Sequence, residues 1–275
     1  MPGERRERLA ALARQMQRWQ TRRRGQIQRC PSGLAVLDEA LGGGFARGSV
    51  HELLAPSGGV ALSVALLAAA RAVERAAEAP GLDSEPRRSR NHRVQPAARP
   101  LADARILYID VSGDFYPPAA AQRGFPLSRL IVVHAPRMDD ALWACEQTLR
   151  CPAVAAVVLS APCSTRRIAA WTQATRRLQL AAESGQGLGL LVRPVADGPT
   201  FAASRMRFDP IAPSATGATG AESSASDALR ARVCVLKLRE ARPAASFEIE
   251  LPLLPAAARG GAAFASLSAV EAHYA

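Results

Sequence analysis

Lysine is almost absent from this sequence. Lys237 is the only one, so arginine supplies nearly all of the 35 basic residues and of the formal net charge of +11. Arginine suits phosphate groups, because its planar guanidinium donates two parallel hydrogen bonds. A coding sequence rich in G and C also favours arginine, so the charge alone leaves a phosphate-binding surface and an ordinary basic surface both open.

Long apolar runs are missing as well. No stretch reaches the roughly 18 apolar residues of a membrane-spanning helix, and the arginine-rich segment 1–24 has no room for the apolar core of a secretory signal. We therefore expect a cytoplasmic protein that does not enter a membrane. A chain of 275 residues can bury one large core, so we expect one main domain.

Paired cysteines are also lacking. The five cysteines are an odd number, and no two of them form a Cys-x-x-Cys motif, so neither a disulfide framework nor a zinc site is indicated. His134 with Asp139 and Asp140 could suggest a metal site. A strand-end histidine followed by a helix cap explains these residues more simply, so we predict no metal. Glu248 and Glu250 share the solvent face of a strand, which is the ordinary position for such a pair.

What the sequence does contain is a regular alternation of strand and helix patterns. The expected strands are 50–54, 105–110, 130–134, 154–159 and 188–193, and the expected helices are 61–79, one capped by Asp139, and one from Ser164 or Thr165 to Gly185. Strands that alternate with helices imply a parallel sheet. Further on, residues 232–238 and 246–251 predict an antiparallel hairpin. We therefore predict an α/β fold with a mostly parallel sheet flanked by helices and closed by this hairpin.

The ends and two internal stretches differ from this core, which we place at residues 29–254. Residues 1–28 predict a basic helical arm with an apolar stripe of Leu9, Leu12, Met16 and Trp19. This stripe either packs on its own domain or binds a partner. Residues 79–104 and 212–228 have the composition of disordered loops, and 255–275 is a tail.

The core also carries an ordered series of motifs. Segment 32–53 contains Ser-Gly, Leu-Asp and Leu-Gly-Gly-Gly, and resembles the start of the ATPase core of RecA and RadA recombinases. Segments 105–110, 123–130 and 139–159 resemble the elements that follow in those proteins. The resemblance covers roughly residues 30–252 and implies a RecA-like fold.

The residues for nucleotide chemistry are missing from these motifs. A phosphate loop needs glycines, a lysine, and a hydroxyl that holds magnesium. Pro56, Ser57, Gly58 and Gly59 stand at its place, with no lysine after them. The catalytic carboxylate position is Ser112, and the Walker B aspartate position is Ser160. The resemblance therefore implies a degenerate site, and we expect that the chain is not an enzyme and uses no cofactor.

Among degenerate RecA-like proteins, the chain most resembles the ImuA family, in segments 51–54, 114–118, 140–144 and 177–183. ImuA is encoded beside ImuB, an inactive Y-family polymerase, and an error-prone DnaE-type polymerase in damage-induced mutagenesis cassettes. The resemblance implies an accessory role in SOS-induced translesion DNA synthesis at the nucleoid. It also implies binding to an ImuB-type subunit, indirect engagement of the DnaE-type polymerase, and RecA as a further partner.

Two other functions remain open from the sequence. A SulA-type division inhibitor would also use a RecA-like scaffold, but would bind FtsZ. A residual RecA-like ATPase is the other alternative. Contact with single-stranded DNA would fall on the loops after strands 154–159 and 188–193. These loops offer Arg166, Arg167, Arg193, Arg205 and Arg207 as candidate phosphate-binding residues, unless they are simply a solvated surface.

Overall fold

The described part of the chain comprises most of the predicted core, without the greater part of its two predicted loops. The computed structural model describes residues 27–56, 59–78, 103–121, 125–161, 168–194, 198–212, 229–239 and 246–251. The predicted N-terminal arm with Leu9, Leu12, Met16 and Trp19, most of both predicted loops, and the predicted tail lie outside these residues.

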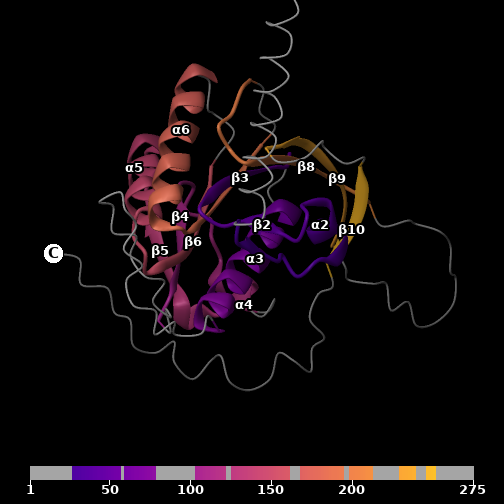
Figure 1. Ribbon diagram of the computed structural model, residues 1–275, viewed down its shortest axis with the longest axis horizontal. Coiled ribbons are helices and arrows are strands. Elements are labelled where there is room, and N and C mark those ends of the chain that lie inside the picture. The colour runs from indigo at the N-terminus through magenta and orange to yellow at the C-terminus, as the bar shows by residue number, and fades with distance from the viewer. Residues whose placement is uncertain are drawn as a thin grey trace, which may run out of the picture.

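An eight-stranded sheet forms the centre of the molecule (Figure 1). Its strand order is β10-β9-β8-β3-β7-β6-β4-β5. The parallel strands are β3 (Ser49–Leu54), β4 (Arg105–Asp110), β5 (Leu130–His134), β6 (Val154–Ser160), β7 (Leu188–Arg193) and β8 (Ser204–Pro210). The antiparallel strands are β9 (Leu229–Leu238) and β10 (Phe247–Leu251). The predicted mostly parallel α/β sheet with an antiparallel hairpin is therefore confirmed.

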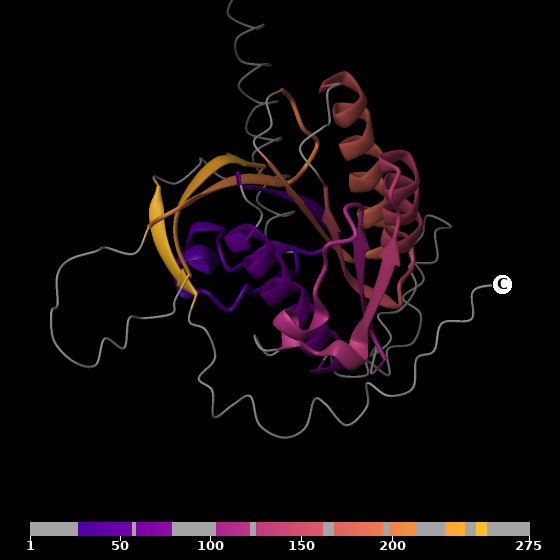
Figure 2. The same cartoon turned by 180° about the vertical axis from the view of Figure 1, so that it is seen from behind.

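Helices cover both faces of the parallel strands, and each face has its own apolar core (Figures 1 and 2). On one face lies α3 (Gly59–Glu78), whose buried alanines, such as Ala65, Ala69 and Ala72, allow close approach to the sheet. The short helices α2 (Ala35–Ala40) and α4 (Pro117–Ala121) lie on the same side. On the other face, α5 (Met138–Leu149) and α6 (Ile168–Gly185) pack against each other.

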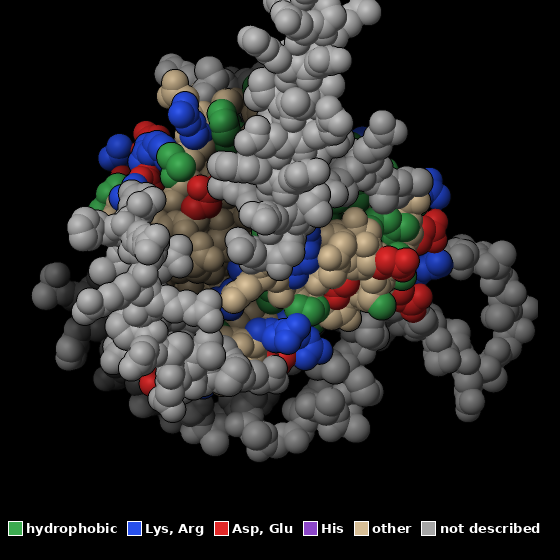
Figure 3. Space-filling model, in the orientation of Figure 1, with side chains coloured by type: hydrophobic (Ala, Val, Ile, Leu, Met, Phe, Trp, Pro, Cys, Tyr) green, Lys and Arg blue, Asp and Glu red, His purple; other side chains and the backbone are tan. Residues whose placement is uncertain are grey.

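The central strands are buried because both of their faces meet helices. All residues of β3 and β7 are buried, as are Val154–Leu159 of β6. A strand that is buried on both faces reads as a continuous apolar run, which is why β6 and β7 were predictable. The hairpin strands differ, since Glu248 and Glu250 of β10 are exposed and Figure 3 shows acidic side chains beside basic ones at that end of the sheet.

A small two-stranded sheet leads into β3. It pairs β1 (Arg29–Cys30) with β2 (Phe45–Ala46), and α2 and the glycine turn lie between them. Asp38 accepts hydrogen bonds from the backbone N–H of Ser32 at 2.7 Å and of Gly33 at 3.3 Å. Gly44 has φ +113°, and a Cβ there would lie 2.4 Å from the Cys30 carbonyl oxygen. The Leu-Asp and Leu-Gly-Gly-Gly motifs therefore hold this turn together.

The bounds of the elements agree with the sequence in most places. Strands 105–110, 130–134 and 188–193 are confirmed residue for residue, and the predicted helix 61–79 is Gly59–Glu78. The prediction that Asp139 caps α5 was wrong. The helix begins at Met138 after Arg137, and no side chain makes a capping hydrogen bond there. The caps predicted at Ser164 and Thr165 lie outside the described residues.

Candidate functional site at the carboxyl edge of the sheet

The candidate site lies where the parallel strands end. In sheets of this kind, ligands bind outside the carboxyl ends of the strands. This edge holds Leu54 before the predicted phosphate loop, Asp110, Ser160 and Arg193. The predicted positions of nucleotide chemistry therefore do converge on one edge of the sheet.

The predicted phosphate loop connects β3 to α3. Pro56 is exposed, α3 begins at Gly59, and Ser57 and Gly58 lie outside the described residues. The hydroxyl of Ser63 donates to the Gly59 carbonyl at 2.8 Å within the helix. A Cβ added at Gly59 would meet nothing within 4 Å, so space is open at the start of α3.

Asp110 is engaged by its own turn. Its two carboxylate oxygens accept hydrogen bonds from the backbone N–H of Gly113 at 2.9 Å and of Phe115 at 3.1 Å. Ser112 is exposed, and Ser160 lies opposite Asp110 in the register of β4 and β6. Ser160 thus occupies the end of β6, as predicted, and Asp110 holds the turn that follows β4.

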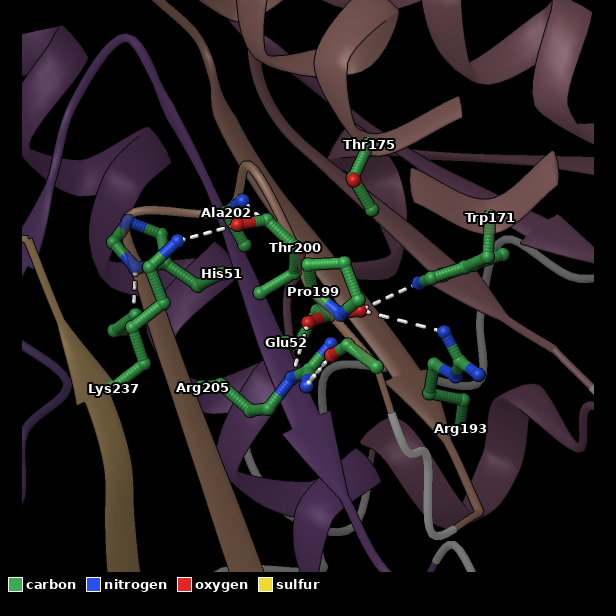
Figure 4. A network of polar contacts seen from close by, with 12 residues as sticks. His51, Glu52, Trp171, Thr175, Arg193, Pro199, Thr200, Ala202, Arg205 and Lys237 are labelled. Atoms are coloured by element: carbon green, nitrogen blue, oxygen red, sulfur yellow. Dashed lines mark hydrogen bonds and ion pairs between the residues drawn. The ribbon is translucent and has the colours of Figure 1, made fainter. Parts of the chain in front are cut away.

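A buried charged cluster lies beside this edge, formed by Glu52, Trp171, Arg193 and Arg205 (Figure 4). The Glu52 carboxylate is fully buried and accepts hydrogen bonds from Trp171 Nε1 at 2.6 Å and Arg205 Nε at 2.7 Å. Arg193 Nη1 is 3.4 Å from the same carboxylate, and its guanidinium carbon lies 3.9 Å from the centre of the Trp171 ring. The cluster holds two guanidinium groups and one carboxylate. Burial lowers the pKa of Arg193, and the Glu52 carboxylate opposes that shift.

Hydrogen bonds hold the segment between β7 and β8 next to this cluster. Arg205 Nη1 donates to the Gly198 carbonyl at 2.7 Å, and Arg239 Nη2 donates to the Phe201 carbonyl at 3.2 Å. Lys237 Nζ donates to the Thr200 carbonyl. Burial, followed by the nearby Arg239 and Arg205, lowers the pKa of Lys237. Residues of β8, β9 and the turn after β9 therefore fix segment 198–203.

Three of the candidate DNA-binding arginines, Arg193, Arg205 and Arg207, lie within the described residues, and they do not form one exposed surface. Arg205 and Arg207 were predicted in a loop, which was wrong, because both lie in β8. Arg193 and Arg205 are buried against Glu52, while Arg207 is partly exposed and pairs with Asp209 at 2.9 Å. Arg166 and Arg167 lie outside the described residues. A DNA-binding role for these arginines stays a prediction.

The Glu52 cluster was missed at the sequence level, although one signal was available. Glu52 is a carboxylate in the middle of an apolar strand, and a buried carboxylate requires a cationic partner. Nothing in the sequence says which of the many arginines supplies it. Strand β8 was not predicted for a related reason. Its buried apolar residues Met206 and Phe208 alternate with charged residues, so the segment does not look like a buried strand. These charged residues are Arg205, Arg207 and Asp209.

Two further features concern the described residues alone. They contain no group of three or more histidine, cysteine, aspartate or glutamate side chains placed to hold a metal ion. None of the helices within those ranges is both long enough and apolar enough to span a membrane.

The strand order, the two helical layers and the carboxyl-edge site define a RecA-like fold. Among solved structures, the chain is similar to the RadB recombinase, with a TM-score of 0.52 and 15% sequence identity, over 80% of this chain and 94% of that one. No family model and no curated protein matches the sequence.

This likeness corrects one expectation. From the missing lysine, hydroxyl and carboxylates, we expected that the chain is not an enzyme. That expectation was wrong, because the chain shares its fold with a recombinase over nearly the whole of that protein. The loss of individual residues is therefore insufficient ground for excluding turnover.

Proposed function

We propose that this chain is a RecA-like accessory protein of SOS-induced translesion DNA synthesis at the nucleoid. It binds an ImuB-type inactive Y-family polymerase subunit and through it engages an error-prone DnaE-type polymerase. RecA and single-stranded DNA are its further partners. The support is the RecA-like fold together with the segments that resemble the ImuA family.

The observation that carries the proposal is the exposure of Trp143. It lies on α5, within the 140–144 segment that resembles ImuA, and 61% of the residue is accessible. Exposed tryptophans are common anchors of protein interfaces, where they supply a large apolar surface at low entropic cost. We therefore place one contact with the polymerase subunit at Trp143. The arm residues Leu9, Leu12, Met16 and Trp19 are a second proposed contact.

Binding to a purified ImuB-type subunit tests the proposal. Trp143→Ala should weaken binding by about 30-fold, corresponding to a loss of about 2 kcal/mol at an interface anchor. The control is Leu236→Ala, which removes another exposed apolar side chain, on β9. Binding to FtsZ without binding to the ImuB-type subunit would instead identify a division inhibitor.

The likeness to a recombinase favours one second candidate, a residual RecA-like ATPase. Phosphate release with and without single-stranded DNA measures it directly. Gly59→Val is the informative variant, because open space at the start of α3 lets the fold accept the side chain, which would then occupy the place of a bound phosphate. Turnover that Gly59→Val abolishes belongs to this site, whereas turnover that persists comes from a contaminant.

A further inference from the structure

Strand β5 forms one edge of the sheet, and its exposed side is apolar. It pairs with β4 alone among the described residues. Ile131 and Val132 are 46% and 43% exposed, and the strand Leu-Ile-Val-Val-His carries no carboxylate, lysine, arginine or proline. Natural proteins protect edge strands with charges, prolines or bulges. The opposite edge strand, β10, has such charges at Glu248 and Glu250, and β5 has none.

The backbone of β5 shows which groups face the open edge. The N–H of Ala135 donates to the Asp110 carbonyl of β4 at 2.9 Å. Because backbone groups alternate sides along a strand, Ile131 and Val133 also point toward β4. Val132 and His134 therefore point their N–H and C=O groups away from the sheet. The Leu130 carbonyl points the same way, while its N–H bonds to Leu127.

This arrangement is symmetric about Val132. We propose that β5 pairs with β5 of a second copy of this chain, antiparallel, around a two-fold axis that passes midway between the two Val132 residues. Val132 of each copy exchanges both hydrogen bonds with its mate, and His134 N–H donates to Leu130 of the mate, which gives about four new backbone bonds. The two sheets then continue into one another, and the Val132 side chains meet at the axis.

The charges that flank β5 fit this antiparallel pairing. Arg105 and Arg129 lie at its amino end. Just beyond its carboxyl end lie the exposed Arg137, Asp139 and Asp140. Arg137 pairs with Asp140 at 3.6 Å, so these three side chains keep one net negative charge. The two-fold axis brings the amino end of one copy beside the carboxyl end of the other. The basic amino end of each copy thus approaches the carboxyl end of its mate, which has a net negative charge, whereas a parallel pairing would bring ends of like net charge together.

Sedimentation equilibrium at micromolar protein concentration tests the proposal. The unmodified chain should be a dimer, and Val132→Lys should weaken dimerisation at least tenfold, since it places two ammonium groups at the axis. Leu236→Lys is the matched control, because Leu236 is also 46% exposed but lies in β9, which is paired on both sides. This control should remain dimeric, and an unchanged far-UV circular dichroism spectrum should show that Val132→Lys is folded, since loss of the dimer by itself lowers the thermal midpoint.

A cross-link tests the position of the axis. In an antiparallel hydrogen-bonded pair the Cα atoms are about 5.5 Å apart, within the range for a disulfide. Val132→Cys should therefore form a disulfide-linked dimer under mild oxidation, well above the level given by the native cysteines of the unmodified chain. A monomeric unmodified chain, or a dimer that survives Val132→Lys, would overturn the proposal. If the unmodified chain is monomeric and Val132→Lys abolishes its binding to the polymerase subunit, β5 is instead a contact with that subunit, which also overturns the proposal.

Discussion

At the scale of single residues, Glu52 connects more elements of the fold through its side chain than any motif predicted from the sequence. It lies in the central strand and joins β3 to α6, β7 and β8 through Trp171, Arg193 and Arg205. A buried carboxylate is tolerated only when cationic or hydrogen-bond partners compensate for its lost hydration. The three partners are therefore one unit with Glu52, although they lie more than a hundred residues away in the sequence.

Glu52→Gln should destabilise the protein by about 3–5 kcal/mol, because it leaves two guanidinium groups buried without their carboxylate. Urea denaturation followed by fluorescence measures this loss. Glu183→Gln removes an exposed carboxylate, 3.5 Å from Arg239, and should cost no more than about 0.5 kcal/mol. Equal effects of the two substitutions would contradict the role given to the cluster.

His51, the neighbour of Glu52, faces the opposite side of the sheet and gives a prediction about pH. Burial lowers the pKa of His51 from 6.5 to about 4, against the raising effect of its hydrogen bond with the Ala46 carbonyl. Between these pH values, His51 is therefore protonated in the unfolded chain and neutral in the folded chain. Stability should be intact above pH 6.5 and fall by about 3 kcal/mol as the pH drops toward 4.

The measurement is the difference in unfolding free energy between the unmodified chain and His51→Gln at each pH, because carboxylates titrate in the same window. Glutamine retains a donor and an acceptor for Ser204 and the Ala46 carbonyl but does not titrate. The difference between the two proteins should shrink as the pH falls. A constant difference would mean that His51 is not the titrating group.

At the scale of elements, the glycine turn before β3 has the strictest local requirement. Gly44→Ala places a Cβ 2.4 Å from the Cys30 carbonyl oxygen in a backbone region that favours glycine, so we expect a loss of about 1–3 kcal/mol or more. Gly59→Ala is the control, since its Cβ meets nothing and α3 gains a better helix former. Thermal midpoints compare the two, and a smaller midpoint shift for Gly44→Ala than for Gly59→Ala would refute the assignment.

The strands differ in how well the sequence predicts them. β4, β6 and β7 were predictable because residues such as Val157 and Leu190 lie in uninterrupted apolar runs, and β10 was predictable from its alternation around Ile249. β8 was not, because the cations of Arg205 and Arg207 belong to a cluster and an ion pair that only the folded sheet assembles. The candidate site divides in the same way. The local motif at Ser160 was predictable, whereas the contacts of Glu52 depend on long-range register.

At the scale of the whole molecule, the positive charge bears on the proposed contact with single-stranded DNA. With Arg193 and Arg205 held by Glu52, we expect the phosphate contacts from Arg166, Arg167 and Arg207. Replacing these three by alanine should reduce the slope of log affinity against log salt by about 0.7 for each phosphate that is no longer neutralised. Fluorescence anisotropy across a salt series measures the slope. Replacing Arg71 and Arg230, exposed arginines elsewhere on the surface, should change it little.

The position of β3 in the middle of the sheet has a consequence for synthesis of the chain. β3 is the first strand of the sheet to leave the ribosome, yet its two neighbours are β7 and β8, which follow it by more than 130 residues. Until residue 210 has emerged, an apolar strand with a carboxylate at its centre has neither its hydrogen-bonding partners nor its counter-charges. Closing contacts over such separations is slow. Newly made chains should therefore depend on chaperones until the last parallel strands arrive, and a chain truncated before β7 should aggregate rather than fold.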